Sequence, residues 1–362
     1  MFNSYPFDRR TGDGGLGHYG FERSILLYVE SQRRRWVMVN EGDGRAEAET
    51  GAVVAAMARL RGGDDTRVDH LKSFCGAEKR LKLFEANIYK AEEFEAAIQG
   101  CEFVFHVATP LLHTEGLKHT NRVDATLDAA RSIATACIRS GTVRRLVYTA
   151  TVMAASPLKD DGSGFKDFMD ETCWTPLNLS IPYNNDFLQE YTQSKTLAEK
   201  ELLSFGSTGN GKMEVVTLAC GLVGGENLIP NLSGSVITFL AQLTNDEFTL
   251  NSLKFLEELL AKIPIVHIDD VCDAHIFCMK QSSMNGRFLC ANAYISTAEI
   301  AGYYKKNYPE FSIRKEHLED PKNGTKWGSN LLNERGFQYK CDWHMVLDDC
   351  ISFARKHRYL GL

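Results

Sequence analysis

A tyrosine and a lysine four residues apart are the pair in this chain most clearly suited to chemistry. Tyr191 and Lys195 lie in the segment DFLQEYTQSKTLAEKELLSFG, where apolar residues recur at three- and four-residue steps, which predicts a helix. Positions i and i+4 share one helix face, so the phenol and the ammonium can point at one object. Because a nearby cation favours the ionised phenol, the pair could give a proton to an oxygen that gains negative charge.

The spacing alone is weak, because a chain with thirteen tyrosines is expected to contain YxxxK by chance about once. The surrounding elements must therefore position the pair. From about residue 51, strand-like segments alternate with helical ones. The strands are AVVAAMARL, RLKLFEANI, EFVFHVATP, RRLVYTATVMAA and MEVVTLAC, and the helices include KAEEFEAAIQ and NRVDATLDAARSIATACIRS, the latter closed by Gly141. This alternation predicts a Rossmann-type, doubly wound α/β fold with a parallel sheet.

After Cys220 the pattern is less regular and predicts a smaller mixed α/β lobe over residues 221–362. We expect helices in SVITFLAQL, LKFLEELLAKI, VCDAHIFCMKQ, STAEIAGYYKKNY and HMVLDDCISFARKH, and strands in IPIVHIDD and RFLCA. Asp269 or Asp270 should cap one helix, and Ser296 or Thr297 another. We expect residues 263–281 to return to the first lobe, over 51–220, and the second lobe to cover the ligand-binding ends of its strands.

Composition excludes several classes of protein. The 362 residues are 44% apolar and 24% charged, which is ordinary for a globular chain. The net charge of −6 and the absence of a dense basic block argue against nucleic acid as a partner. Ten scattered cysteines without CxxC predict reduced thiols. No run approaches a membrane span and no signal peptide is evident, so we expect a cytoplasmic protein, a monomer or a weak homodimer.

Other residues are better explained by packing than by chemistry. His106 and His267 sit singly in buried strand patterns, without a metal-ligand motif, so we expect core histidines with satisfied hydrogen bonds and no metal. Three aromatic residues after Cys220 could line a substrate pocket, but each is better explained as core packing. They are Phe239, Phe248 and Phe255.

Several strings, in order, carry a family resemblance: GCEFVFHVATP, VRRLVYTATVMAASPL, DETCWTPLN, YTQSKTLAEKELL, EVVTLACGLVGG, IPIVHIDDVCDAHIFCM and GRFLCANAY. Together they resemble the plant branch of the extended short-chain dehydrogenases/reductases, which includes dihydroflavonol, anthocyanidin, cinnamoyl-CoA and HC-toxin reductases. The strings around TATVMAASPL and DETCWTPLN are most similar to those of HC-toxin reductases. The resemblance covers about residues 51–362. It implies an NADPH-dependent reductase of a small-molecule carbonyl substrate.

The resemblance also assigns catalytic roles. Tyr191 matches the proton donor of the family, and Lys195 matches the residue that lowers the phenol pKa and holds the nicotinamide ribose. Thr151 stands where the family usually has a serine that hydrogen-bonds the substrate carbonyl. These roles agree with the chemistry, since hydride transfer places negative charge on the carbonyl oxygen, where positioned donors stabilise it best.

The NADP(H) site is implied in the same way. Arg61 matches an arginine that would pair with the 2′-phosphate, although Arg59 competes for this role because the count slips by one. Asn87 and Ile88 stand where the family has an aspartate and an apolar residue around the adenine.

Two further stretches would lie along the cofactor. Val107, Ala108 and Thr109 match the loop that passes the cofactor ribose. Ala219 replaces a family proline beside the nicotinamide, which changes the expected backbone shape there.

Residues 1–50 do not fit the family pattern. Gly14, Gly17 and Gly20 have GxxGxxG spacing, but the polar SYPFDRR before them is not the buried strand that a dinucleotide loop requires. Gly20 and Arg61 are 41 residues apart, against about 19 implied by the family. ERSILLYVESQ could be helical, and WVMVN could serve as an extra strand.

Three explanations of this segment stay open: a reorganised loop with an insertion, a different first exon, or loss of the first strand. The last would leave a strand edge open in the centre of the sheet. It would also favour a rival function, a non-catalytic relative with impaired cofactor binding. An epimerase or dehydratase on the same scaffold is a further alternative.

Overall fold

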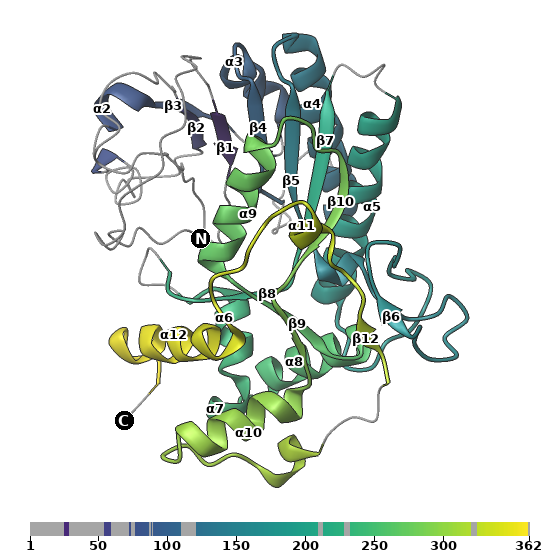
Figure 1. Ribbon diagram of the computed structural model, residues 1–362, viewed down its shortest axis with the longest axis vertical. Coiled ribbons are helices and arrows are strands. Elements are labelled where there is room, and N and C mark those ends of the chain that lie inside the picture. The colour runs from purple at the N-terminus through teal and green to yellow at the C-terminus, as the bar shows by residue number, and fades with distance from the viewer. Residues whose placement is uncertain are drawn as a thin grey trace.

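A seven-stranded parallel sheet forms the centre of the protein (Figure 1). The computed structural model describes residues 25–28, 54–58, 72–73, 77–86, 88, 90–109, 121–208, 213–227, 232–319 and 324–360. The strand order is β10-β7-β5-β4-β1-β2-β3. These strands are β1 (Ile25–Tyr28), β2 (Val54–Ala58), β3 (Leu81–Glu85), β4 (Phe103–His106), β5 (Arg145–Thr151), β7 (Glu214–Cys220) and β10 (Gly286–Cys290). The predicted doubly wound α/β fold is confirmed.

The central strand β1 lies within ERSILLYVESQ, the segment that by its sequence could be helical, and the structure has a strand there instead. β1 pairs with β2 on one side and with β4 on the other, in parallel. A short apolar run such as ILLY carries no periodicity that separates strand from helix, so pairing with its neighbours decides its structure. The centre of the sheet is thus filled, and the alternative of a missing first strand does not apply. WVMVN lies outside the described residues.

Helices cover both faces of the sheet (Figure 1). α4 (Arg122–Ser140) and α5 (Asp186–Thr208) pack together on one face, and α9 (Ile268–Lys280) packs on β5 and β7 from the other. Asn121 caps α4 by accepting a hydrogen bond from Asp124 N, at 2.8 Å. Gly141 ends this helix with φ 68°, as predicted, because the left-handed conformation favours glycine.

A smaller mixed layer lies beyond the carboxyl ends of the sheet strands (Figure 1). Its three-stranded sheet has the order β11-β9-β8, with β9 antiparallel to β11 and parallel to β8. A two-stranded sheet pairs β12 with β6. The strands are β6 (Phe168–Met169), β8 (Leu222–Gly224), β9 (Ile263–His267), β11 (Ala293–Ile295) and β12 (Lys326–Trp327). The helices are α6 (Gly234–Phe239), α7 (Ala241–Thr244), α8 (Glu247–Leu260), α10 (Thr297–Asn307), α11 (Leu331–Glu334) and α12 (Trp343–Lys356).

The shorter elements complete the connections between these layers. They are α2 (Ala77–Arg80), η1 (Ala91–Phe94), α3 (Glu95–Ile98), η2 (Val152–Ala154) and η3 (Lys315–Leu318). Of these, η2 matters most for function, because it follows β5 directly and packs against α5 and α8.

One of the two predicted helix caps in the carboxyl-terminal part of the chain is confirmed and the other is wrong. Ser296 caps α10 within a capping box, as predicted. The cap of α9 is His267 rather than Asp269 or Asp270, because β9 runs to His267 and the imidazole Nδ1 accepts from Asp269 N at 3.1 Å. Asp270 instead accepts hydrogen bonds from two backbone N–H groups near residue 340.

Apolar side chains fill two clusters, one on each face of the main sheet. The larger one joins α4, α5 and the helices of the smaller layer, and the other lies beneath α9. Phe239 and Phe255 are fully buried in the larger cluster, as predicted. Phe248 is 67% exposed, so the prediction of core packing was wrong there. It lies in the first turn of α8, whose apolar face is turned towards the core.

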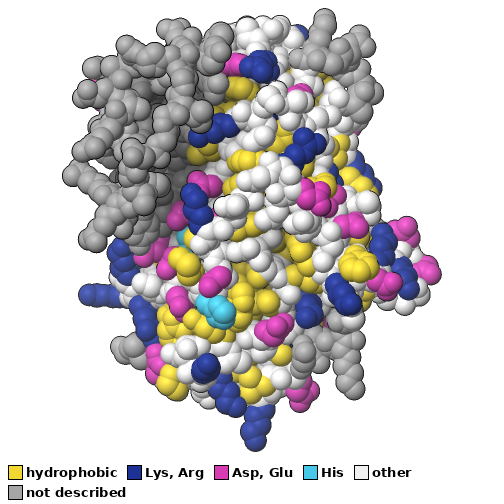
Figure 2. Space-filling view, in the orientation of Figure 1, with side chains coloured by type: hydrophobic (Ala, Val, Ile, Leu, Met, Phe, Trp, Pro, Cys, Tyr) yellow, Lys and Arg dark blue, Asp and Glu magenta, His cyan; other side chains and the backbone are white. Residues whose placement is uncertain are grey.

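The surface mixes both signs of charge. On the face shown in Figure 2, acidic and basic side chains are interspersed around apolar ones. Within the described part of the chain, no helix combines the length and apolarity needed to cross a bilayer. The nine cysteines of the same residues are free thiols, and eight of them are buried.

Candidate active site

Lys195 projects from α5 towards the ends of two sheet strands, where its ammonium is almost completely buried. Its Nζ donates hydrogen bonds to Thr109 Oγ1 at 3.1 Å, Tyr148 Oη at 2.6 Å and the carbonyl oxygen of Thr149 at 2.7 Å. Nζ also lies 4.1 Å from the centre of the Tyr148 ring, a cation–π distance. An ammonium has three N–H donors, so this site uses all of them.

Burial controls the charge of this lysine. Removal from water lowers the pKa of Lys195 to about 7, while the neighbouring Glu199 and Cys220 side chains oppose the shift. Glu199 lies one helical turn beyond Lys195 and is fully buried. The ammonium is therefore a marginal cation near neutral pH, and its hydrogen-bond acceptors favour the charged form.

Tyr191 lies one turn before Lys195 on the same helix, next to the end of β5. Burial, with a smaller contribution from the Cys220 thiol, raises the pKa of the Tyr191 phenol to about 12, and a hydrogen bond with Thr151 opposes the rise. Thr151 is the last residue of β5, and its hydroxyl also accepts from Met153 N at 3.3 Å. The structure thus brings the three predicted catalytic residues to one edge of the sheet.

Burial is the largest influence on the Tyr191 pKa and raises it. Lys195 Nζ directs its hydrogen bonds to Thr109, Tyr148 and Thr149. The expected lowering of the Tyr191 pKa by Lys195 stays a prediction.

His275 fixes one of the lysine's acceptors from the opposite face of the sheet. Its Nδ1 lies 2.7 Å from the carbonyl oxygen of Val271, and its Nε2 lies 2.7 Å from Thr149 Oγ1. A carbonyl can only accept, so Nδ1 carries the proton and Nε2 accepts from the Thr149 hydroxyl. Burial lowers the pKa of His275 to about 4, which keeps the imidazole neutral.

His106 and Tyr148 show what sequence reasoning missed. His106 is 2% exposed, and its Nδ1 has no hydrogen-bond partner, so the predicted satisfied histidine was wrong. The rings of His106 and Tyr148 lie 5.1 Å apart on adjacent strands, beside Lys195. The only sign of Tyr148 in the sequence was a hydroxyl-bearing side chain within an otherwise apolar strand that was predicted to be buried.

The predicted cofactor residues have different placements. Val107, Ala108 and Thr109 directly follow β4 at the carboxyl edge of the sheet, and Thr109 contacts Lys195. Ala219 is a fully buried residue of β7, and Ile88 is a buried core residue.

The remaining predicted cofactor residues, Arg59, Arg61 and Asn87, lie outside the described residues. Gly14, Gly17 and Gly20 do too, and they precede β1 in the chain, whereas the phosphate loop of a dinucleotide fold follows the first strand.

The polar groups fit a nicotinamide dinucleotide. Open parallel sheets bind such ligands at the carboxyl ends of their strands, near the switch in strand order. Here β1 lies between β2 and β4, and Thr109, Thr151 and Lys195 gather at that edge beside His106, whose buried Nδ1 has no hydrogen-bond partner. No group of three or more potential metal ligands occurs among the described residues.

Comparison with known proteins agrees with this geometry. Residues 48–291 match the model of the NAD dependent epimerase/dehydratase family. The chain is 30% identical to an anthocyanidin reductase of Vitis vinifera over 276 residues, covering 76% of this chain and 80% of the relative. It is 31% identical to vestitone reductase of Medicago sativa over 296 residues, covering 81% and 86%.

A solved structure gives the same result. The crystal structure of vestitone reductase from alfalfa superposes with a TM-score of 0.66 at 28% identity, covering 86% of this chain and 92% of that one. The predicted plant reductase branch and the nicotinamide cofactor are thus confirmed at the level of the family. The chain belongs to the NAD dependent epimerase/dehydratase family, as an oxidoreductase related to the plant anthocyanidin and vestitone reductases.

Proposed function

We propose that this chain is an NADPH-dependent reductase of a ketone or related carbonyl in a secondary metabolite. The observation that carries the proposal is the buried Lys195, tied to the ends of β4 and β5 next to Tyr191 and Thr151. The names of the relatives, anthocyanidin reductase and vestitone reductase, support this substrate class. Among such substrates, the strings shared with HC-toxin reductases favour a toxin carbonyl.

Thr151 and Tyr191 act on the carbonyl oxygen. The Thr151 hydroxyl would orient the substrate, whose carbonyl carbon would receive the hydride that a nicotinamide cofactor supplies when bound. As negative charge develops on the oxygen, Tyr191 transfers its phenolic proton to it, giving the alcohol and a tyrosinate that takes a proton back from solvent. With a pKa near 12, Tyr191 holds its proton at neutral pH and is ready to act as the acid.

Lys195 would contact the cofactor and stabilise the negative charge that forms on Tyr191. Its ammonium would hold the ribose by exchanging one of its three protein acceptors for a ribose hydroxyl, and when charged it would stabilise the tyrosinate that forms during reduction. Arg61, which resembles the family arginine, would pair with the 2′-phosphate and so favour NADPH over NADH.

The proposed function is tested first by measuring cofactor binding and then by substituting Tyr191. We expect NADPH to bind the full chain at micromolar concentration in a fluorescence titration. A panel of flavonoid ketones and carbonyl toxins is then screened for net NADPH consumption, and we expect at least one of them to be reduced. Tyr191→Phe should lower kcat by about 10² to 10⁴, the usual contribution of a positioned acid. Tyr304→Phe is the matched control, because its buried hydroxyl contacts only the smaller layer.

Three results would overturn the assignment. Absence of binding at millimolar NADPH would favour a non-catalytic relative. Turnover that survives Tyr191→Phe, with cofactor binding intact, would exclude Tyr191 as the acid. Turnover without net NADPH consumption would instead indicate an epimerase or dehydratase.

A further inference from the structure

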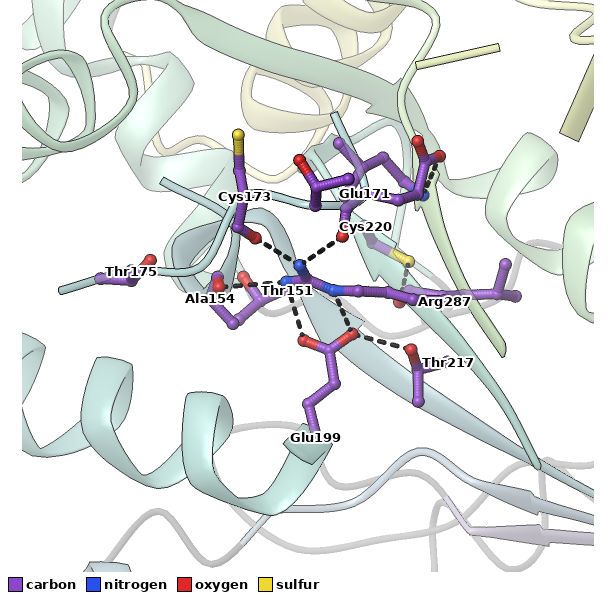
Figure 3. A network of polar contacts seen from close by, with 12 residues as sticks. Thr151, Ala154, Glu171, Cys173, Thr175, Glu199, Thr217, Cys220 and Arg287 are labelled. Carbon is purple, nitrogen blue, oxygen red and sulfur yellow. Dashed lines mark hydrogen bonds and ion pairs between the residues drawn. The ribbon is translucent and has the colours of Figure 1, made fainter. Parts of the chain in front are cut away.

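A buried arginine on β10 meets the helix that carries the proposed catalytic pair. Arg287 Nε lies 3.0 Å from Glu199 Oε1, and the arginine Nη2 lies 3.2 Å from Glu199 Oε2. The two side chains are 6% and 0% exposed. Figure 3 shows the guanidinium at the centre of a polar network and the Glu199 carboxylate rising from α5 to meet it.

The guanidinium also holds three backbone carbonyls. Nη2 donates to Ala154 O at 3.0 Å, and Nη1 donates to Glu171 O at 3.0 Å and to Cys173 O. Together with the two bonds to Glu199, these contacts use all five N–H donors of an arginine. Figure 3 shows these contacts converging from separate segments of the chain.

The segments that Arg287 joins are those that carry the proposed site. Ala154 follows Thr151 by three residues, at the end of η2. Glu199 follows Lys195 by four residues, so the two lie on one face of α5. The network therefore fixes the turn after the Thr151 strand against the helix that carries Tyr191 and Lys195.

Two further contacts hold Arg287 and Glu199 in place. Thr217 on β7 donates to Glu199 Oε1 at 2.7 Å. The guanidinium carbon of Arg287 lies 3.6 Å from the centre of the Trp174 ring. The Arg287 head group is thus fixed by stacking as well as by hydrogen bonds, an arrangement that the flexible ammonium of lysine cannot reproduce.

We propose that Arg287 and Glu199 are positioning residues of the reductase site, an inference that rests on the proposed function. Arg287 sets the distance between the Thr151 turn and α5. Glu199 supplies the buried negative charge that holds Lys195 in its ammonium form, and Arg287 keeps Glu199 in place.

The electrostatics support the role of Glu199. Its carboxylate raises the pKa of Lys195 against the larger opposite effect of burial. Replacing Glu199 by glutamine removes this charge and keeps the side-chain shape, so the Lys195 pKa should fall below 7 by about one unit. Lys195 would then lose its proton at a lower pH.

A second buried ion pair offers a matched control. Arg145, at the start of β5, pairs with Glu214 and donates to the carbonyl oxygens of Met279 and Gln281. It lies at the opposite end of β5 from Thr151, roughly 20 Å away along the strand. Arg145→Lys should therefore weaken the fold without altering Lys195.

The experiment measures the Lys195 pKa directly, by NMR of ¹³Cε-labelled lysine in the full chain, with the Lys195 signal identified by its loss in Lys195→Met. We expect Glu199→Gln to lower this pKa by about one unit. Arg145→Lys should leave it unchanged. Arg287→Lys should lower kcat/KM by on the order of 10² through misplacement of the site, with more loss in kcat than in KM.

The outcomes separate this inference from the proposed function. An unchanged Lys195 pKa in Glu199→Gln overturns the positioning role of Glu199, whatever reaction the chain performs. Arg287→Lys kinetics equal to those of Arg145→Lys overturn the role of Arg287. A shifted Lys195 pKa together with activity that survives Tyr191→Phe refutes the reductase mechanism and leaves the role of Glu199 standing. Should Arg287→Lys fail to fold, the Lys195 pKa in the isosteric Glu199→Gln still decides the role of Glu199, and a wild-type kcat/KM in that variant overturns the importance of the Arg287–Glu199 contact.

Discussion

The hydroxyl of Tyr148 should set the pH at which the enzyme loses activity. It accepts a hydrogen bond from the Lys195 ammonium at 2.6 Å. Tyr148→Phe removes this acceptor but keeps the ring 4.1 Å from Nζ, so the cation–π contact survives. The substitution therefore removes the hydrogen bond to the ammonium and the hydrogen bond that Tyr148 makes with Thr109, and the first of these acts directly on the lysine charge.

The magnitude follows from that bond. A hydrogen bond to a charged group contributes about 1.5–3 kcal/mol, and one pKa unit corresponds to about 1.4 kcal/mol. Losing the bond destabilises the ammonium, so the Lys195 pKa should fall by about one to two units. The wild-type value is about 7, so the variant should titrate near pH 5 or 6, and roughly a tenth or less of its lysines should be charged at neutral pH.

The assay is the pH profile of kcat/KM for NADPH, which reports ionisations of the free enzyme. The protonated lysine is the active form, so the wild-type profile should fall as pH rises through about 7. In Tyr148→Phe this alkaline limb should move to lower pH, with about tenfold less activity at pH 7. Tyr304→Phe removes an equally buried hydroxyl, bonded to Phe239 O, and should leave the limb in place. A Tyr148→Phe profile that superposes on the wild type, or a limb displaced to higher pH, would refute the reasoning.

Two further predictions concern the proposed donor and the packing behind it. Thr151→Val should lower kcat by about 10² to 10³, the usual cost of one donor to a developing oxyanion, whereas Thr151→Ser should keep most of the activity; equal kinetics of the two variants would contradict the role of the hydroxyl. Gly224→Ala should lower the free energy of unfolding by about 1–3 kcal/mol, because the added Cβ would lie 2.8 Å from Phe239 and Cys350. Its control, Gly302→Ala in α10, meets no atom within 4 Å and should raise stability by about 0.5–1 kcal/mol, both measured by denaturant unfolding.

Features with a local cause were predictable from the sequence. Gly141 ends α4 and Ser296 caps α10 because each acts on backbone groups within a few residues. Tyr191 and Lys195 share a helix face for the same reason. β1 was missed because its strand conformation depends on pairing with β2 and β4, which lie far along the chain.

The side chains that surround Lys195 could not be predicted from the sequence, because they too come from distant parts of the chain. Its partners Thr109 and Tyr148 lie 86 and 47 residues away, the first just after β4 and the second on β5. Strand register decides which side chains reach the lysine, and no periodicity encodes register between strands separated by helices. Resemblance to the family located Thr109, but it supplied no reason to single out Tyr148 or His106.

The opposite shifts of the two central residues explain where the site places its polar groups. Burial favours the neutral form of both, raising the pKa of Tyr191 and lowering that of Lys195. For the acid this is harmless, since Tyr191 must hold its proton until the substrate oxygen becomes basic. For Lys195 it is adverse, because the lysine is useful only when charged.

The structure accordingly directs its acceptors to the lysine. Thr109, Tyr148 and the Thr149 carbonyl take its three N–H groups, and the Glu199 carboxylate lies one turn away. The pH sensitivity of the enzyme should therefore reside in Lys195 and the residues that hold its charge. Substitutions around Tyr191 should change the rate at all pH values, whereas substitutions around Lys195 should change the pH at which the rate is lost.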